Sequence, residues 1–281
     1  MFDSGVGGLT VLRELAAALP GQEFIYLGDT ARLPYGTKSA DTVARYSLQC
    51  AEALLARGIA GLVVACNTAS ASALGPLRAR HPHLPVIGVI EPGAAAAVAA
   101  SQSQHIAVIG TEGTINGGAY QAEIRRRNPA ARISARACSM FVALAEEGWT
   151  SGPIAEAIAR RYLDPLFTAA DAPDTLVLGC THFPLLAEVL RSVLPAHVRI
   201  VDSAATTAQA LVGSMALRPA ASRDPGRGEA GRSHGGRSHG GRVHGAHIRW
   251  LATDDAERFA RVGGRFFGTE LHADAVEIID L

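Results

Sequence analysis

Short apolar runs alternate with helical patterns along most of the chain, and this alternation constrains the fold more than any other feature. The apolar runs lie at residues 24–28, 61–66, 85–90, 105–110, 175–180 and 198–202. Helical spacing of apolar residues covers residues 9–19, 39–57, 68–80, 113–127, 151–169, 182–193 and 203–217. The alternation predicts an α/β protein with mainly parallel sheets flanked by helices. Since ligands of such folds bind beyond the carboxyl ends of the strands, polar residues directly after an apolar run are the first candidates for a site.

Residues 218–246 interrupt the alternation and are rich in glycine, arginine and histidine. A near repeat of GGRSH spaces His234, His239 and His244 evenly, which leaves a metal-binding tract open as one interpretation. A flexible insertion is favoured, because the segment has no apolar residue able to offset the entropy of ordering. After it, residues 247–281 predict a strand, a helix and a strand.

Charge and composition narrow the class of protein. The formal net charge is +0, so no global electrostatic attraction to nucleic acid or to an anionic membrane is expected. No stretch is long and apolar enough to span a membrane and no signal peptide opens the chain, which together predict a cytoplasmic protein. Cys50 and Cys138 are interpreted as buried apolar residues, and without a CxxC pair neither a zinc site nor a disulfide is expected.

The other two cysteines, Cys66 in VVACNTASA and Cys180 in LGCTHFPLL, each end an apolar run. A helix that starts there would bind a carboxylate and would lower the thiol pKa from about 8.5. Two equivalent thiols from two similar halves suggest one base and one acid on opposite faces of a planar carbon intermediate, as the inversion of a carbon centre requires. The polar residues that follow the two thiols are Asn67, Thr68, Thr181 and His182.

The opening FDSGVGGLTV places Asp3 and Ser4 before a glycine turn and a helix, an arrangement that suits a carboxylate or a phosphate. A dinucleotide site is disfavoured, because the spacing is GxGG rather than GxGxxG. An ordinary helix N-cap remains the alternative for Asp3. In the loop at 27–39, a simple turn is the favoured interpretation, with Tyr35 closing over a small ligand as the alternative.

Weak internal similarity points to two related halves. FDSGVGG at 2–8 pairs with VDSAATT at 201–207, and ACNTAS at 65–70 pairs with GCTHFP at 179–184. The chain has one lysine, Lys38, so a pyridoxal phosphate Schiff base is not expected and no cofactor is predicted. Proton transfer would then use protein acids and bases, with fixed donors stabilising a carbanion.

The motifs FDSGVGGLTV, PYG, VVACNTASA, GVIEP, LGCTHFPLL and VDS occur in this order, and together they resemble the glutamate racemases of the Asp/Glu racemase superfamily. The resemblance implies two similar α/β domains, residues 1–93 with 247–281 and residues 94–211, with the active site in the cleft between them. It also implies interconversion of L- and D-glutamate without cofactor or metal, and supply of D-glutamate for peptidoglycan. A racemase for aspartate or another small acid and a non-catalytic amino-acid-binding homologue remain alternatives, and a homodimer is left open.

The resemblance also assigns roles to individual residues. Cys66 would take the α-proton from D-glutamate with help from Asp3, and Cys180 would take it from L-glutamate with help from His182. Glu146 matches a further acidic position, with a solvated helix-end carboxylate as the alternative. The implied substrate-binding positions are Asp3, Ser4, Pro34, Tyr35, Gly36, Asn67, Thr68, Thr181 and His182.

The strand expected before FDSG is reduced to Met1 and Phe2. We therefore expect an unpaired sheet edge with a poorly held Asp3, or a natural start several residues upstream of Met1.

Overall fold

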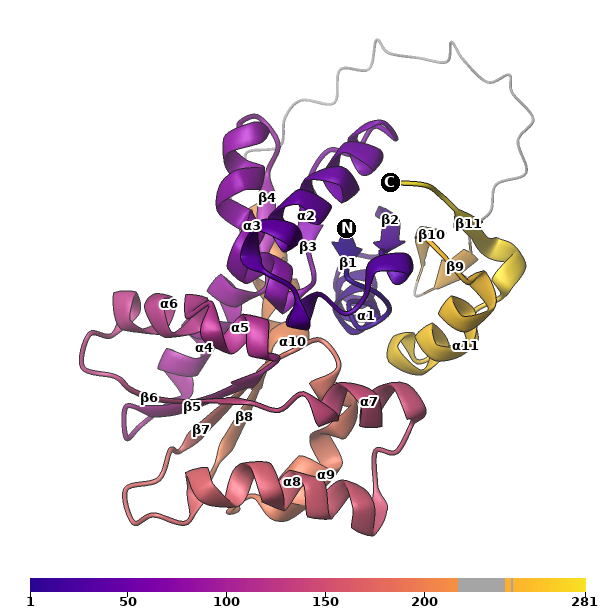
Figure 1. Ribbon diagram of the computed structural model, residues 1–281. Coiled ribbons are helices and arrows are strands. Elements are labelled where there is room, and N and C mark those ends of the chain that lie inside the picture. The colour runs from indigo at the N-terminus through magenta and orange to yellow at the C-terminus, as the bar shows by residue number, and fades with distance from the viewer. Residues whose placement is uncertain (217–240, 244) are drawn as a thin grey trace, which may run out of the picture.

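The structure is a computed structural model that describes residues 1–216, 241–243 and 245–281. Its described residues form two sheets, which occupy the upper and lower parts of the molecule in Figure 1. The upper sheet has the order β11-β10-β2-β1-β3-β4, in which all neighbours are parallel, and β9 pairs antiparallel with β10. Its strands are β1 (Phe2–Asp3), β2 (Glu23–Gly28), β3 (Leu62–Val64), β4 (Val86–Gly88), β9 (Gly241–Val243), β10 (Ala246–Ala252) and β11 (Val276–Ile278).

Strand β1 lies inside this sheet, between β2 and β3. Phe2 pairs with Leu27 on one side and with Val64 on the other, and Asp3 pairs with Gly28. The expectation of an unpaired edge was therefore wrong, because the short strand has a neighbour on both sides. Asp3 therefore lies at the carboxyl end of a strand in the middle of the sheet.

Helices cover both faces of the upper sheet, as a parallel sheet requires. One face packs against α2 (Ala40–Leu55) and α3 (Asn67–Arg80), through buried residues such as Val43 and Leu77. The other face packs against α1 (Leu9–Ala18), α10 (Ser203–Ala216) and α11 (Ala256–Phe267). Short 3-10 helices occupy the loops after β2, at Thr30–Arg32 and Tyr35–Thr37, and Ala273–Ala275 before β11.

The lower sheet is parallel in the order β6-β5-β7-β8. Alternate residues of its central strands point to opposite faces: Val108 and Val177 pack in one core, and Ile109 and Leu178 in the other. Its strands are β5 (His105–Gly110), β6 (Arg132–Ala137), β7 (Thr175–Gly179) and β8 (Arg199–Asp202). The flanking helices are α4 (Ile90–Ala100), α5 (Glu112–Asn116) and α6 (Ala119–Arg127) on one side, and α7 (Met140–Glu147), α8 (Gly152–Phe167), the 3-10 turn Phe183–Leu186 and α9 (Ala187–Val193) on the other.

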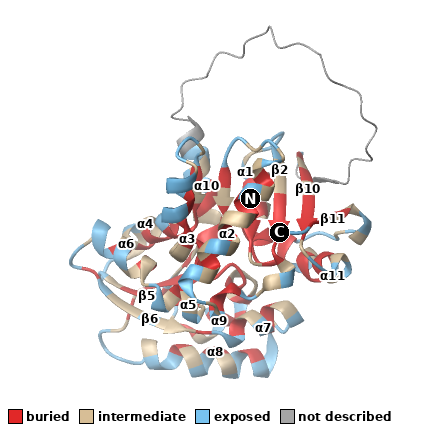
Figure 2. Ribbon diagram, turned by 45° about the horizontal axis from the view of Figure 1, so that its top comes forward, coloured by how far each residue is buried: buried red, intermediate tan, exposed pale blue. Residues whose placement is uncertain are grey.

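The predicted α/β class with two mainly parallel, helix-flanked sheets is confirmed. Figure 2 shows the reason for its sequence pattern, since central strands such as β5 and β7 are buried while the helices expose their outer faces. The helix predicted at 113–127 is divided in two, because Gly118 adopts a left-handed φ of 66° between α5 and α6. Helices α4 and α7 were not predicted.

Residues 218–240 and 244 of the expected insertion lie outside the described residues. Its last part was assigned wrongly: residues 241–243 form β9, and Ala246 begins β10. The main-chain pairing with β10 orders these three residues. Among the helices that the structure describes, none is both long and apolar enough to cross a membrane.

Candidate active site

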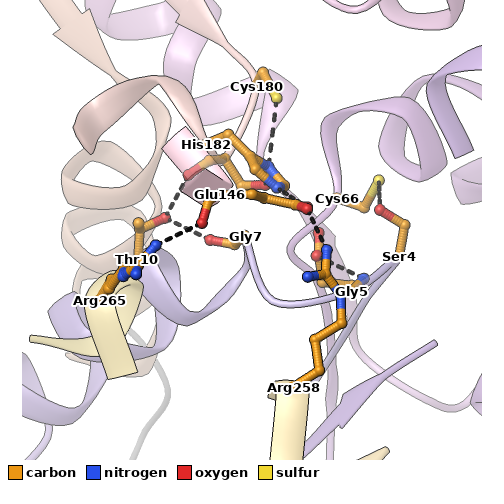
Figure 3. Close-up of polar contacts among 12 residues, drawn as sticks. Ser4, Gly5, Gly7, Thr10, Cys66, Glu146, Cys180, His182, Arg258 and Arg265 are labelled. Atoms are coloured by element: carbon orange, nitrogen blue, oxygen red, sulfur yellow. Dashed lines mark hydrogen bonds and ion pairs between the residues drawn. The ribbon is translucent and has the colours of Figure 1, made fainter. Parts of the chain in front are cut away.

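Each of the two thiols follows the carboxyl end of a strand. In both cases the neighbouring strand ends at an aspartate that is followed by a serine. Cys66 follows β3, which is paired with β1 and its Asp3. Cys180 follows β7, which is paired with β8 and its Asp202. The internal similarity seen in the sequence thus corresponds to two adjacent strand pairs, one in each sheet. The two thiols lie where these strand ends meet, as Figure 3 shows for Cys66 and Cys180.

Cys66 is the N-cap of α3 and is only 5% exposed. Its Sγ accepts a hydrogen bond from the amide of Ala69 at 3.4 Å and donates to Oγ of Ser4 at 3.7 Å. Burial nevertheless raises the pKa of the Cys66 thiol to about 12, and the charge of Asp3 adds to this effect. The expectation that the helix start lowers this pKa was therefore wrong, because loss of water outweighs the two hydrogen bonds. Cys66 rests as a protonated thiol at neutral pH.

Cys180 has a different set of partners. Its Sγ lies 3.8 Å from Nδ1 of His182, whose Nε2 lies 3.1 Å from Oε1 of Glu146. Because a carboxylate only accepts, Nε2 carries the proton of that bond and Nδ1 faces the sulfur. Burial alone would favour a neutral ring, but the bonds with Cys180 and Glu146 raise the pKa of His182 to about 10. The imidazole beside Cys180 is therefore charged at neutral pH.

Asp3 is fully buried, and its Oδ2 accepts a hydrogen bond from the amide of Gly5 at 3.0 Å. Burial raises its pKa, while His182 and nearby amide groups oppose that rise in part. Its Oδ1 has no partner among the described residues. The N-cap alternative was wrong, because α1 begins at Leu9 without a side-chain cap. Asp3 is a buried acid whose charge is felt by Cys66.

Side chains from the two halves meet at the start of α3. The hydroxyl of Tyr120 on α6 donates to Oδ1 of Asn67 at 2.8 Å, while the buried Nδ2 of Asn67 has no partner among the described residues. Thr68 shares hydrogen bonds with Thr111 at 2.9 Å and Thr114 at 3.1 Å. The unpaired amide of Asn67 is thus a free donor beside Cys66.

Sequence reasoning missed Thr111, Thr114 and Tyr120. The available signal was TEGT directly after the apolar run HIAVIG, which is another strand end followed by polar groups.

Gly7 and Thr10 bring the first helix against the second thiol loop. Thr10 Oγ1 is 2.9 Å from the carbonyl oxygen of Gly7 and 3.1 Å from that of Thr181. A Cβ added at Gly7 would lie 2.3 Å from Oγ1 of Thr181 and 2.4 Å from Nδ1 of His182. The glycine is required here because the ring of His182 occupies the space of a side chain.

The PYG loop lies at the same junction, with Gly36 against Thr111. The hydroxyl of Tyr35 points elsewhere: it donates to the buried carboxylate of Asp29 and contacts Sγ of Cys50 at 3.8 Å. The structure therefore places the phenol of Tyr35 in the core of the first half, where it anchors the loop, while Gly36 packs against Thr111 and Gly113 at the junction.

Pro34, preceded by a cis peptide bond, begins the PYG turn. Glu146 rather than Glu147 reaches His182, so the alternative of a solvated carboxylate does not apply to Glu146. Within the described residues no group of three or more His, Cys, Asp or Glu side chains is arranged to hold a metal ion.

The fold and the site define a class: a two-sheet α/β protein with a buried strand-end thiol in each half, each with its own polar partners. Residues 6–211 match the model of the Asp/Glu/hydantoin racemase family. The chain belongs to this family, which makes it an isomerase, and the resemblance noted in the sequence is confirmed.

Relatives cover the whole chain. It is 48% identical to a glutamate racemase of Geobacter metallireducens over 275 residues, which is 96% of this chain and 93% of the relative. Among solved structures, a glutamate racemase isoform of Bacillus anthracis has a TM-score of 0.85 at 32% identity, covering 100% of this chain and 96% of that one. A glutamate racemase of Francisella tularensis, solved with D-glutamate, has a TM-score of 0.81 at 32% identity, covering 99% and 96%.

Proposed function

We propose that this protein interconverts L- and D-glutamate by proton transfer between two thiols and that it supplies D-glutamate for peptidoglycan. The observation that carries the proposal is the pair of buried cysteines, Cys66 and Cys180, at equivalent strand ends of the two sheets. Similarity to glutamate racemases along the whole chain supports glutamate as the substrate.

The two thiols have different neighbours at the start of the reaction. Nδ1 of the charged His182 ring faces Sγ of Cys180, whereas burial keeps Cys66 protonated. Cys180 then takes the α-proton of L-glutamate, and Cys66 delivers its proton to the opposite face of the carbanion. The product is D-glutamate, and the enzyme is left with a Cys66 thiolate and a Cys180 thiol. D-glutamate is converted by the same steps in reverse.

Fixed donors at the start of α3 are suited to the substrate. The buried Nδ2 of Asn67 lacks a partner among the described residues, so a substrate carboxylate would satisfy it. The hydroxyl of Tyr120 holds the other end of the same amide and so sets its direction. Donors that are already oriented stabilise developing negative charge without reorganisation.

The experiment is a circular dichroism assay of L-glutamate and, separately, L-aspartate with no added cofactor. Loss of optical activity with glutamate is expected, and loss with aspartate alone would refute the assignment of substrate. Cys66→Ser and Cys180→Ser should each nearly abolish racemisation. Cys138→Ser is the matched control, because Cys138 is a buried thiol of the second half whose Sγ donates to the carbonyl oxygen of Arg136. A serine variant of either proposed base that keeps the full rate would refute the two-thiol scheme.

A further inference from the structure

Glu146 is held from both ends by arginines of α11, far away in sequence. Nη2 of Arg258 donates to Oε2 of Glu146 at 2.7 Å, and Nη1 of Arg265 donates to the carbonyl oxygen of the same residue at 2.7 Å. Glu146 ends α7 in the second half, whereas α11 packs on the upper sheet. Figure 3 shows both arginines reaching Glu146. The carboxylate is therefore anchored across the junction between the halves.

The two carboxylate oxygens of Glu146 have different hydrogen-bond partners. Oε2 is taken by Arg258, which leaves Oε1 directed at Nε2 of His182. Burial would raise the pKa of Glu146, but His182 and Arg258 together hold it below its usual range, so the group is an anion at neutral pH. The ring of Phe266, also on α11, lies edge-on to the ring of His182, with the two ring centroids 4.9 Å apart, and limits rotation of the imidazole.

We propose that Arg258 is a positioning residue for proton transfer at Cys180: it holds Glu146 so that Nδ1 of His182 faces the sulfur. The inference rests on the proposed function and extends it to a residue that does not touch the reacting atoms. Its effect falls mainly on the Cys180 side, because the hydrogen-bond partners of Cys66 are Ser4 and Ala69 and His182 influences Cys66 only indirectly, through Asp3. Groups that face His182 are Cys180, Glu146 and the buried Asp3.

One-sided action has a kinetic signature. The two enantiomers have equal free energy, so any variant must change kcat/KM equally in both directions. The substrate deuterium isotope effects in the two directions need not change equally. Each effect reports how far removal of the α-proton from that enantiomer limits the rate. If only the step at Cys180 is slowed, the deuterium effect on L-[2-²H]glutamate rises and that on D-[2-²H]glutamate falls. A general loosening of the site would move both in the same direction.

The test variant is Arg258→Gln, with Arg258→Lys to restore charge and Arg261→Gln as a matched control on the exposed side of α11. Arg258→Gln should lower kcat/KM roughly 10-fold, a part of the about 10²–10⁴-fold that a general acid–base group contributes. The isotope effects should separate as described, Arg258→Lys should recover part of the loss, and Arg261→Gln should match the wild type. Isotope effects that stay equal to those of the wild type would overturn the proposal.

A second measurement needs no turnover. The Nε2 proton of His182, bonded to a carboxylate, gives a downfield NMR signal that Arg258→Gln should shift upfield and expose to faster solvent exchange. An unchanged signal would overturn the positioning role, whereas failure of the wild type to racemise glutamate would refute only the function. In a double variant with Glu146→Gln, the loss should equal that of Glu146→Gln alone, since Arg258 acts through Glu146. Additive losses would contradict this.

Discussion

Replacing Gly7 by alanine tests whether the position of His182 governs turnover. The new Cβ would lie 2.4 Å from Nδ1 and 2.5 Å from Cε1 of the ring. Non-bonded atoms of this kind need about 3.5 Å, so the ring must retreat by roughly 1 Å. A misplacement of about 1 Å costs on the order of 100-fold in rate, and overpacking costs about 1–3 kcal/mol of stability.

The assay compares kcat for L-glutamate with the free energy of unfolding in urea. Gly7→Ala should lose roughly 100-fold in kcat while the protein stays folded, because the atoms that it displaces are side-chain atoms of Thr181 and His182. Gly213→Ala is the control: this exposed glycine of α10 has open space around it, and alanine there should stabilise the helix by about 0.5–1 kcal/mol. Wild-type kcat in folded Gly7→Ala would refute the reasoning.

Three further predictions concern groups around the thiols. Asp3→Asn should lower the pKa of Cys66 by removing a neighbouring negative charge, so alkylation of Cys66 by iodoacetamide quickens while turnover falls; an unchanged alkylation rate would contradict this. Tyr120→Phe should leave Oδ1 of Asn67 unpaired, which costs about 1–3 kcal/mol in thermal unfolding and raises KM for glutamate; an unchanged KM would count against a binding role. The pKa of Glu146 is depressed in the folded state, so its contribution to stability is fully present above pH ~4.3 and is lost as the pH falls through the lower folded pKa. Glu146→Gln should therefore flatten the acid side of the pH–stability curve. An unaltered curve would argue against the pairing of Glu146 with His182 and Arg258.

Strand ends were the most informative feature of the sequence. The apolar runs marked the buried parallel strands closely, and the residues after two of them, Cys66 and Cys180, come together in the structure. Helix α4 was missed because its alanine-rich sequence directly follows β4 and shows no amphipathic period. Helix α7 was missed because it spans only 8 residues, about two turns.

Other parts of the site depend on contacts that no local pattern contains. Arg258 lies on an ordinary amphipathic helix, and its bond to Glu146 joins residues 112 positions apart. The resemblance implied a substrate-binding role for Tyr35, but the buried carboxylate of Asp29 offers its phenol a partner in the core. The pKa of Cys66 also depends on burial, which a sequence motif for a helix start does not report.

The central claim is that two different thiols handle the α-proton, one on each face of the carbon. The most direct measurement is the early time course of L-glutamate turnover in deuterium oxide, with both enantiomers separated and their isotopic content measured. A two-base reaction predicts D-glutamate that carries deuterium at the α-carbon, while the remaining L-glutamate keeps its protium. D-glutamate that retains the original α-proton would mean that one group serves both faces, and it would contradict the claim.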